Sequence, residues 1–172
     1  MIKLLKQFIS YNSEFTGGKN HQTKNHQTIS WVIPGKLAVG SLPRSGFGKQ
    51  LAEANIKTIL SLCDRHEGIL PAEITDNFQC IRLVLPDRHY ETEITAEQIN
   101  QAVEIIHHSL KNNQAVYVHC LAGIERSPTV CIAYLCRYNK LELWEAFNWL
   151  KEVHPRSQPS PAGVRALREF SK

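Results

Sequence analysis

The chain has 172 residues, of which 42% are hydrophobic and 21% charged, and it carries a net charge of +4. This size fits one globular domain with a sizeable core and excludes a large multidomain assembly. Residues 1–28 hold four lysines against one glutamate and so contribute +3, leaving +1 for the remainder. A nearly neutral body gives no indication of a nucleic-acid partner.

The first 28 residues are predicted to form a partly flexible leader. From residue 10 onward they are polar, and the pentapeptide KNHQT occurs twice in tandem, at 19–23 and 24–28. Such a composition cannot fill a core. The repeat is either a replicated flexible linker or a tail in which His21 and His26 bind a metal or a docking partner. Whether residues 1–9 form a short amphipathic helix that docks on the body stays open.

The cysteines and the hydropathy pattern favour a cytoplasmic protein. Five cysteines are an odd number, they lack paired or zinc-binding spacing, and a chain of this length does not need disulfides, so reduced thiols are expected. Lys3 and Lys6 interrupt the apolar N-terminal stretch, which argues against a secretory signal. No run reaches the roughly 18 apolar residues of a membrane span.

From Ile29 onward, short apolar runs alternate with helical periods. The runs at 37–39, 58–62, 80–85 and 115–119 are rich in Val, Ile or Leu and are flanked by turn residues, which is typical of strands. This alternation predicts a single α/β domain over residues 29–172, with a central, mostly parallel sheet of four to five strands flanked by helices.

Helices are predicted between and after these strands. Phe47, Leu51 and Ala54 share one face before the second strand. Thr95 and Gln98 form a capping-box pair before the fourth, and three helical segments follow it, the first and last opening at Ser127 and Ser160, each with proline next. An apolar stripe after Thr95 comprises Ile99, Ala102, Val103, Ile106 and Leu110.

The most informative stretch runs from Tyr117 to Pro128, where a strand ends at His119, a loop begins at Cys120 and a helix begins near Ser127. A strand–loop–helix turn directs backbone N–H groups and the positive end of the helix at one spot, which favours an anion. The planar guanidinium of Arg126 matches two phosphate oxygens. The same field stabilises a thiolate at Cys120. The alternative is a buried structural cysteine.

The spacing Cys120-x5-Arg126-Ser127, with His before and Pro after, resembles the signature of the cysteine-dependent protein tyrosine phosphatase superfamily, most closely its dual-specificity branch. The resemblance extends over residues 30–170. It implies a phosphatase that uses Cys120 as nucleophile, forms a cysteinyl-phosphate and requires no metal or other cofactor. Ser127 would assist the departing thiolate, and His119 would tune Cys120 without touching substrate. The phosphate-binding residues would be Leu121, Ala122, Gly123, Ile124, Glu125 and Arg126.

Asp87 is the predicted general acid, since the leaving oxygen must be protonated. It follows the third strand as Cys120 follows the fourth, and parallel strands bring their C-terminal ends to one sheet edge. Asp64, after the second strand, is the alternative. Glu91 and Glu93 lie farther along the Asp87 loop and are expected to be solvated.

The predicted substrates are phosphotyrosine and phosphoserine or phosphothreonine in proteins, by analogy with the family. The loop interior contains no lysine, and Glu125 disfavours highly anionic substrates. The alternatives are a phosphatase acting on phosphoglucan or phospholipid, a phosphopeptide-binding module without turnover, and a sulfur transferase of the rhodanese kind.

Two further features remain open. Cys63 ends the second strand at the same sheet edge, so it either forms a reversible disulfide with Cys120 under oxidation or is simply packed. Arg156, Gln158 and Ser160 precede the last helix and are expected either near the pocket or in an ordinary turn.

Overall fold

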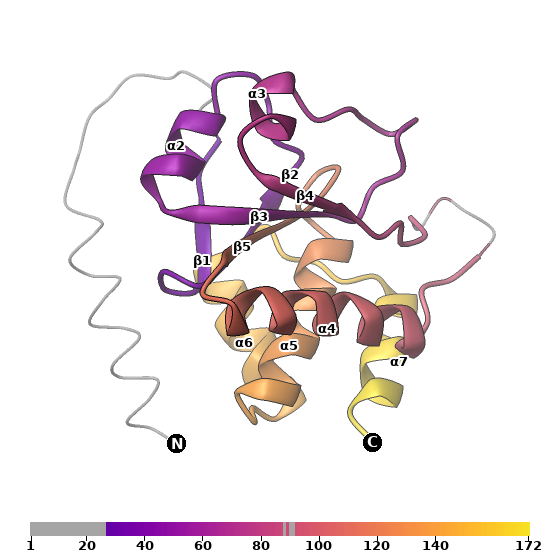
Figure 1. The fold of residues 1–172 in the computed structure, drawn as a ribbon. Helices are drawn as coiled ribbons and strands as arrows, with labels where there is room; N and C mark the ends of the chain where they lie inside the picture. Colours follow the sequence, from indigo (N-terminus) through magenta and orange to yellow (C-terminus); the bar gives the residue numbers. More distant parts are fainter. Residues whose placement is uncertain (1–26, 88, 90–91) are drawn as a thin grey trace.

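The structure is a computed structural model that describes residues 27–87, 89 and 92–172 (Figure 1). The predictions for the leader before residue 27, including His21 and His26, and the one for Glu91 lie outside the described residues. None of the helices in the described ranges is long and apolar enough to cross a membrane.

A five-stranded sheet forms the centre of the fold, in the order β1-β2-β5-β3-β4. All neighbouring strands run parallel except β1 and β2, so the prediction of a mostly parallel sheet is confirmed. The central position of β5 places its C-terminal end between those of β2 and β3. The strands are β1 (Ser30–Ile33), β2 (Leu37–Ser41), β3 (Ile56–Ser61), β4 (Gln79–Arg82) and β5 (Ala115–Cys120).

Helices cover both faces of the sheet (Figure 1). On one face lie α2 (Gly48–Glu53) and α3 (Ala72–Thr75); on the other lie α4 (Ala96–Lys111), α5 (Arg126–Tyr138), α6 (Leu143–Val153) and α7 (Pro161–Phe170). The alternation of side chains along β5 explains the two layers. Val116 and Val118 join the core under α4–α7, whereas Ala115 and Tyr117 join the core under α2 and α3.

The predicted helix starts are confirmed in two places. Thr95 and Gln98 form the reciprocal capping box of α4, and the Ser160 hydroxyl accepts a hydrogen bond from the Gly163 N–H at the start of α7.

Two elements were not predicted, and one strand is shorter than expected. β1 and α3 have four residues each, too few for a periodic pattern. β4 ends at Arg82 rather than at residue 85, although Leu83 and Leu85 still donate backbone hydrogen bonds to Ser61 and Leu62.

Candidate active site

The connection from β5 to α5 is a loop of five residues between Cys120, the last residue of β5, and Arg126, the first of α5. Two backbone hydrogen bonds hold it from outside. Leu42 N–H donates to the Leu121 carbonyl (3.2 Å) and Gln158 N–H to the Ile124 carbonyl (2.7 Å). The segment before α7 therefore lies against the loop, which answers the question left open for Gln158.

Gly123 is the loop position that requires glycine. Its φ is +70°, and a Cβ there would lie 2.6 Å from the carbonyl carbon of Gly40 and 2.7 Å from the amide nitrogen of Ser41. Real Cβ contacts are not this short, so the loop approaches β2 at a distance that only glycine allows.

His154, just after α6, fixes the same glycine. Its Nε2 lies 2.7 Å from the Gly123 carbonyl oxygen, and its Nδ1 lies 2.8 Å from the Ser30 hydroxyl of β1. Because a carbonyl only accepts, Nε2 carries the proton and Nδ1 accepts from Ser30. Burial lowers the pKa of His154, which favours this neutral imidazole.

Cys120 lies at the base of the loop, 2% exposed. The Ser127 hydroxyl lies 3.3 Å from the Cys120 sulfur and 3.2 Å from the Gly40 carbonyl oxygen. Its single proton serves one acceptor at a time, so it is available to the sulfur whenever negative charge develops there.

The guanidinium of Arg126 is buried, 2% exposed, and is held by two carboxylates. Glu67 binds it in a bidentate manner, with 2.6 Å from Nη2 to Oε1 and 2.9 Å from Nη1 to Oε2. Asp87 Oδ2 lies 2.8 Å from the same Nη2. The Leu62 and Leu85 carbonyls accept further hydrogen bonds from Nη1, at 3.3 and 3.2 Å.

These contacts shift the pKa values of both Arg126 and Glu67. Burial opposes the charge of Arg126, but the hydrogen bonds to Glu67 and the surrounding negative groups outweigh it, so the pKa of Arg126 is raised. Burial likewise opposes the charge of Glu67, yet hydrogen bonds from Arg126 and from the Asp64 N–H keep its pKa lowered. Both groups therefore stay ionised at neutral pH.

A cavity of about 350 Å³ lies over the loop, and we call it the loop cavity. Most of the predicted site residues come together there. It is lined by Glu67, Asp87, His89, Cys120, Leu121, Ala122, Ile124, Glu125 and Arg126. Asp64 is not among its lining residues and instead lies 3.1 Å from His66, while Glu93 lies 2.6 Å from Arg165.

His119 is fully buried beneath the loop. Its Nδ1 lies 3.3 Å from the Cys120 carbonyl oxygen, and its Nε2 is buried with no partner among the described residues. Burial lowers its pKa to about 4, with the charges of Arg82 and Arg126 adding to the effect, so the ring is neutral at physiological pH.

Cys63 is buried as well, and burial raises its pKa to about 12, with the proximity of Cys120 adding to that. A thiol with such a pKa is a poor source of thiolate. The disulfide between Cys63 and Cys120 stays a prediction, and this burial would make its formation slow.

Sequence reasoning missed two residues of the site, Glu67 and His154. Glu67 follows β3, as Asp64 does, so the rule that parallel strands bring their C-terminal ends to one sheet edge also applies to Glu67. For His154 no local signal exists, because its partners Ser30 and Gly123 are far away in the chain.

The chain matches one known family, described as the catalytic domain of dual specificity phosphatases, over residues 37–172. The dual specificity protein phosphatase 22-B of Danio rerio is 32% identical over 142 residues, which cover 83% of this chain and 73% of that protein. A phosphatidylglycerophosphate phosphatase of Arabidopsis thaliana is 28% identical over 134 residues, which cover 78% of this chain but 40% of that protein.

Solved structures support the fold. The crystal structure of Tk-PTP in its active form has a TM-score of 0.74 at 21% identity, covering 83% of this chain and 95% of that one. At 21% sequence identity, this similarity shows only that the helices and strands are arranged in the same fold.

Proposed function

The chain belongs to the family of dual-specificity phosphatase catalytic domains, and from that membership we propose that it hydrolyses phosphate monoesters of proteins through a cysteinyl-phosphate intermediate. The observation that carries this proposal is that Cys120, Arg126 and Asp87 line one cavity over the loop.

In the first step the Cys120 thiolate attacks phosphorus as the bond from phosphorus to the leaving oxygen breaks. The loop amides and Arg126 hold the non-bridging oxygens. A phosphate dianion competes with Asp87 for the Arg126 guanidinium, which frees the Asp87 carboxylate to take a proton from solvent and to pass it to the leaving oxygen.

In the second step water attacks phosphorus while Asp87, now ionised, takes its proton. The bond from sulfur to phosphorus breaks, inorganic phosphate forms and Cys120 departs as a thiolate. The Ser127 hydroxyl, 3.3 Å from the sulfur, stabilises that thiolate. His119 acts from below the loop as a neutral residue that positions Cys120.

The charges around the cavity favour phosphoprotein over more highly charged substrates. Glu67, Asp87 and Glu125 surround a single arginine, and residues 121–125 contain no lysine. A substrate with one phosphate on an otherwise weakly charged peptide meets less repulsion there than a polyphosphorylated headgroup does.

The second candidate is a phospholipid phosphatase. It is favoured by the similarity to the plant relative named as a phosphatidylglycerophosphate phosphatase. Phosphoglucan remains a further alternative, as does a module that binds phosphopeptides without turnover.

We place the catalytic unit at residues 29–172, with residues 1–28 as a leader, and propose that it works in the cytoplasm. All five cysteines are free, which suits a reducing compartment.

The test begins with cleavage of para-nitrophenyl phosphate in the presence of a chelator. Activity should vanish in Cys120→Ser and persist in Cys80→Ser, a control at an exposed cysteine. Phosphopeptide binding without turnover in the natural protein would contradict the proposal.

The general acid can be identified from how strongly the turnover of each variant depends on the leaving group of the substrate. Asp87→Asn should lower turnover by about 100- to 10,000-fold on poor leaving groups and less on activated ones, whereas Asp64→Asn should have little effect. An equal loss in Asp64→Asn alone would move the role to Asp64.

A panel of phosphotyrosine peptide, phosphoserine peptide, phosphatidylglycerophosphate and phosphoglucan then ranks substrates by kcat/KM. Highest values for the peptides support the phosphoprotein proposal, and a lipid that surpasses them reverses it.

A further inference from the structure

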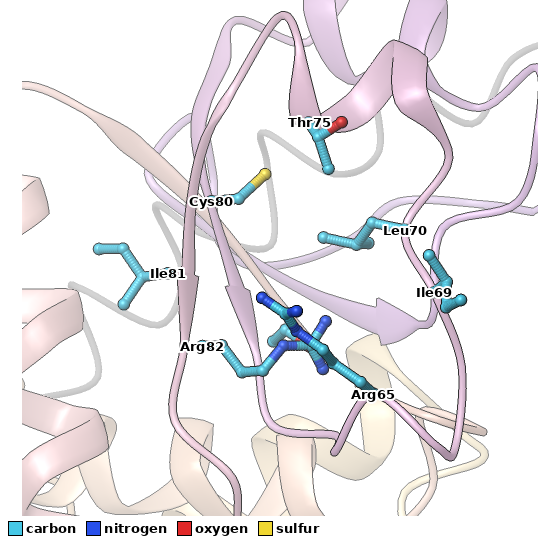
Figure 2. Close-up of a pocket in the computed structure, with 8 residues that line it drawn as sticks. Arg65, Ile69, Leu70, Thr75, Cys80, Ile81 and Arg82 are labelled. Carbon is cyan, nitrogen blue, oxygen red and sulfur yellow. The ribbon is translucent and has the colours of Figure 1, made fainter.

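A second cavity, of about 350 Å³, lies at the edge of the sheet beside β4, and we call it the β4 cavity (Figure 2). Four parts of the fold line it: the end of β3, the loop that follows β3, α3, and the edge strand β4. None of its lining residues is shared with the loop cavity. It is therefore a separate site in the molecule.

Two arginines give this cavity a positive charge. Figure 2 shows Arg65 reaching in from the loop after β3 and Arg82 from β4, at the end opposite Thr75 and Cys80. Among the described residues, Arg82 donates one hydrogen bond, from Nη1 to the Cys63 carbonyl, whereas the guanidinium of Arg65 has no ion pair or hydrogen bond. Among the described residues that line the β4 cavity, none carries a carboxylate.

A buried hydroxyl adds a second, independent sign of a ligand. Ser61 lines the cavity, is 1% exposed, and its Oγ has no hydrogen-bond partner among the residues that the structure describes. A buried hydroxyl that is left unpaired destabilises the folded state, so such groups normally have a partner. Ser61 is paired in register with Arg82, which puts the hydroxyl and that arginine at the same level of adjacent strands.

The remaining wall is apolar. Leu70 lines the cavity, and Ile69, with 79% of its surface exposed, is the most exposed large hydrophobic residue of the described chain. An exposed isoleucine beside two arginines suits a ligand that is anionic at one end and apolar at the other.

We propose that the β4 cavity binds a small amphiphilic anion, in which a phosphate or carboxylate head group lies between Arg65 and Arg82 and a short apolar body lies against Ile69 and Leu70. The Ser61 hydroxyl donates to one oxygen of the head group. Arginine forks match both kinds of oxyanion. The site does not depend on the proposed hydrolysis of phosphoproteins.

The test uses the full chain and amide chemical shifts in an NMR titration. The amides of Arg65, Ile69 and Cys80 report on the β4 cavity, and those of residues 121–126 report separately on the loop cavity. The probes are hexylphosphonate, heptanoate and hexanol, which share an alkyl chain and differ in the head group.

Saturable shifts at the β4 reporters are expected with an anionic probe and not with hexanol. Binding of hexylphosphonate alone identifies phosphate as the head group, and binding of both anions identifies a general oxyanion site. Arg65→Gln and Ser61→Ala should each weaken binding at these reporters, by about tenfold for the arginine. The control Arg168→Gln, an exposed arginine on α7, should leave it unchanged.

Three results would overturn the proposal. Shifts confined to the loop reporters would mean that the β4 cavity binds none of the probes. Equal binding of hexanol would show an apolar pocket without an anion site. An equal loss in Arg168→Gln would show general charge attraction. Since the guanidinium of Arg65 has no partner among the residues that the structure describes, its replacement leaves none of them unpaired, and Arg65→Gln is expected to fold.

Discussion

The buried, neutral His119 makes the stability of the fold depend on pH. Its pKa is lowered from 6.5 to about 4 by burial, whereas in the unfolded chain it returns to its ordinary value. Below pH 6.5 the unfolded state therefore binds a proton that the folded state does not accept. Stability is full above pH 6.5, falls as the pH drops below that value, and stops falling below about pH 4.

The size of the effect follows from the same two values. A fall from 6.5 to about 4 corresponds to about 3 kcal/mol in total. Between pH 7.5 and pH 5, a range in which most carboxylates stay ionised, about 2 kcal/mol of this should be lost.

The assay is urea unfolding of the natural chain and of His119→Gln at both pH values. The variant has no titrating ring at this position, so the natural chain should lose about 2 kcal/mol more than the variant does. His108→Gln, at an exposed histidine of α4, serves as the control and should follow the natural chain.

Parallel pH dependences for the natural chain and His119→Gln would refute the reasoning. If His119→Gln does not fold, the histidine ring resonances of the natural chain answer the same question. The His119 signal should stay in place from pH 7.5 to pH 5, and a titration with a midpoint near 6.5 would contradict the burial argument.

Three further predictions concern the loop and its arginine. Gly123→Ala should lower the free energy of unfolding by about 2 kcal/mol and reduce kcat/KM in a steady-state assay, because φ is +70° and the new Cβ would meet β2 at 2.6 Å. The control Gly35→Ala, at φ +67° with nothing within 4 Å, should cost less stability and leave activity intact. Equal losses of activity in the two variants would contradict the crowding argument. Glu67→Gln should lower the free energy of unfolding by about 3 kcal/mol, because it removes charge from the buried ion pair with Arg126. Added tungstate should raise Tm more in this variant than in the natural chain. An unchanged urea midpoint would show that the ion pair does not contribute to stability. Ser127→Ala should slow hydrolysis of the cysteinyl-phosphate by about tenfold or more, which is seen as a burst of nitrophenol before a slower steady state. A uniform slowing without a burst would place Ser127 in the first step instead.

The loop and its flanking residues were predictable because the relevant signal is local. The eight residues from Cys120 to Ser127 carry the proposed nucleophile, the turn and the helix start in consecutive positions. Asp87 was also accessible, since it follows a recognisable strand and strand order brings it to the same edge.

The residues that surround the loop were not predictable in the same way. Glu67 is one of several acidic residues after its strand, and only the folded structure shows which one reaches Arg126. His154 depends on a contact between the end of α6 and β1, a strand of four residues that the sequence pattern did not reveal. Contacts of such long sequence separation have no periodicity from which they could be inferred.

The supports of the loop also determine when it can take shape as the chain is made. Its contacts come from Leu42 on one side and from His154 and Gln158 on the other. Because the chain is synthesised from its N-terminus, the loop emerges before two of these three partners exist. The site is therefore expected to be completed only after the segment between α6 and α7 has emerged and packed, so that until then a nascent chain carries Cys120 in an unfinished loop.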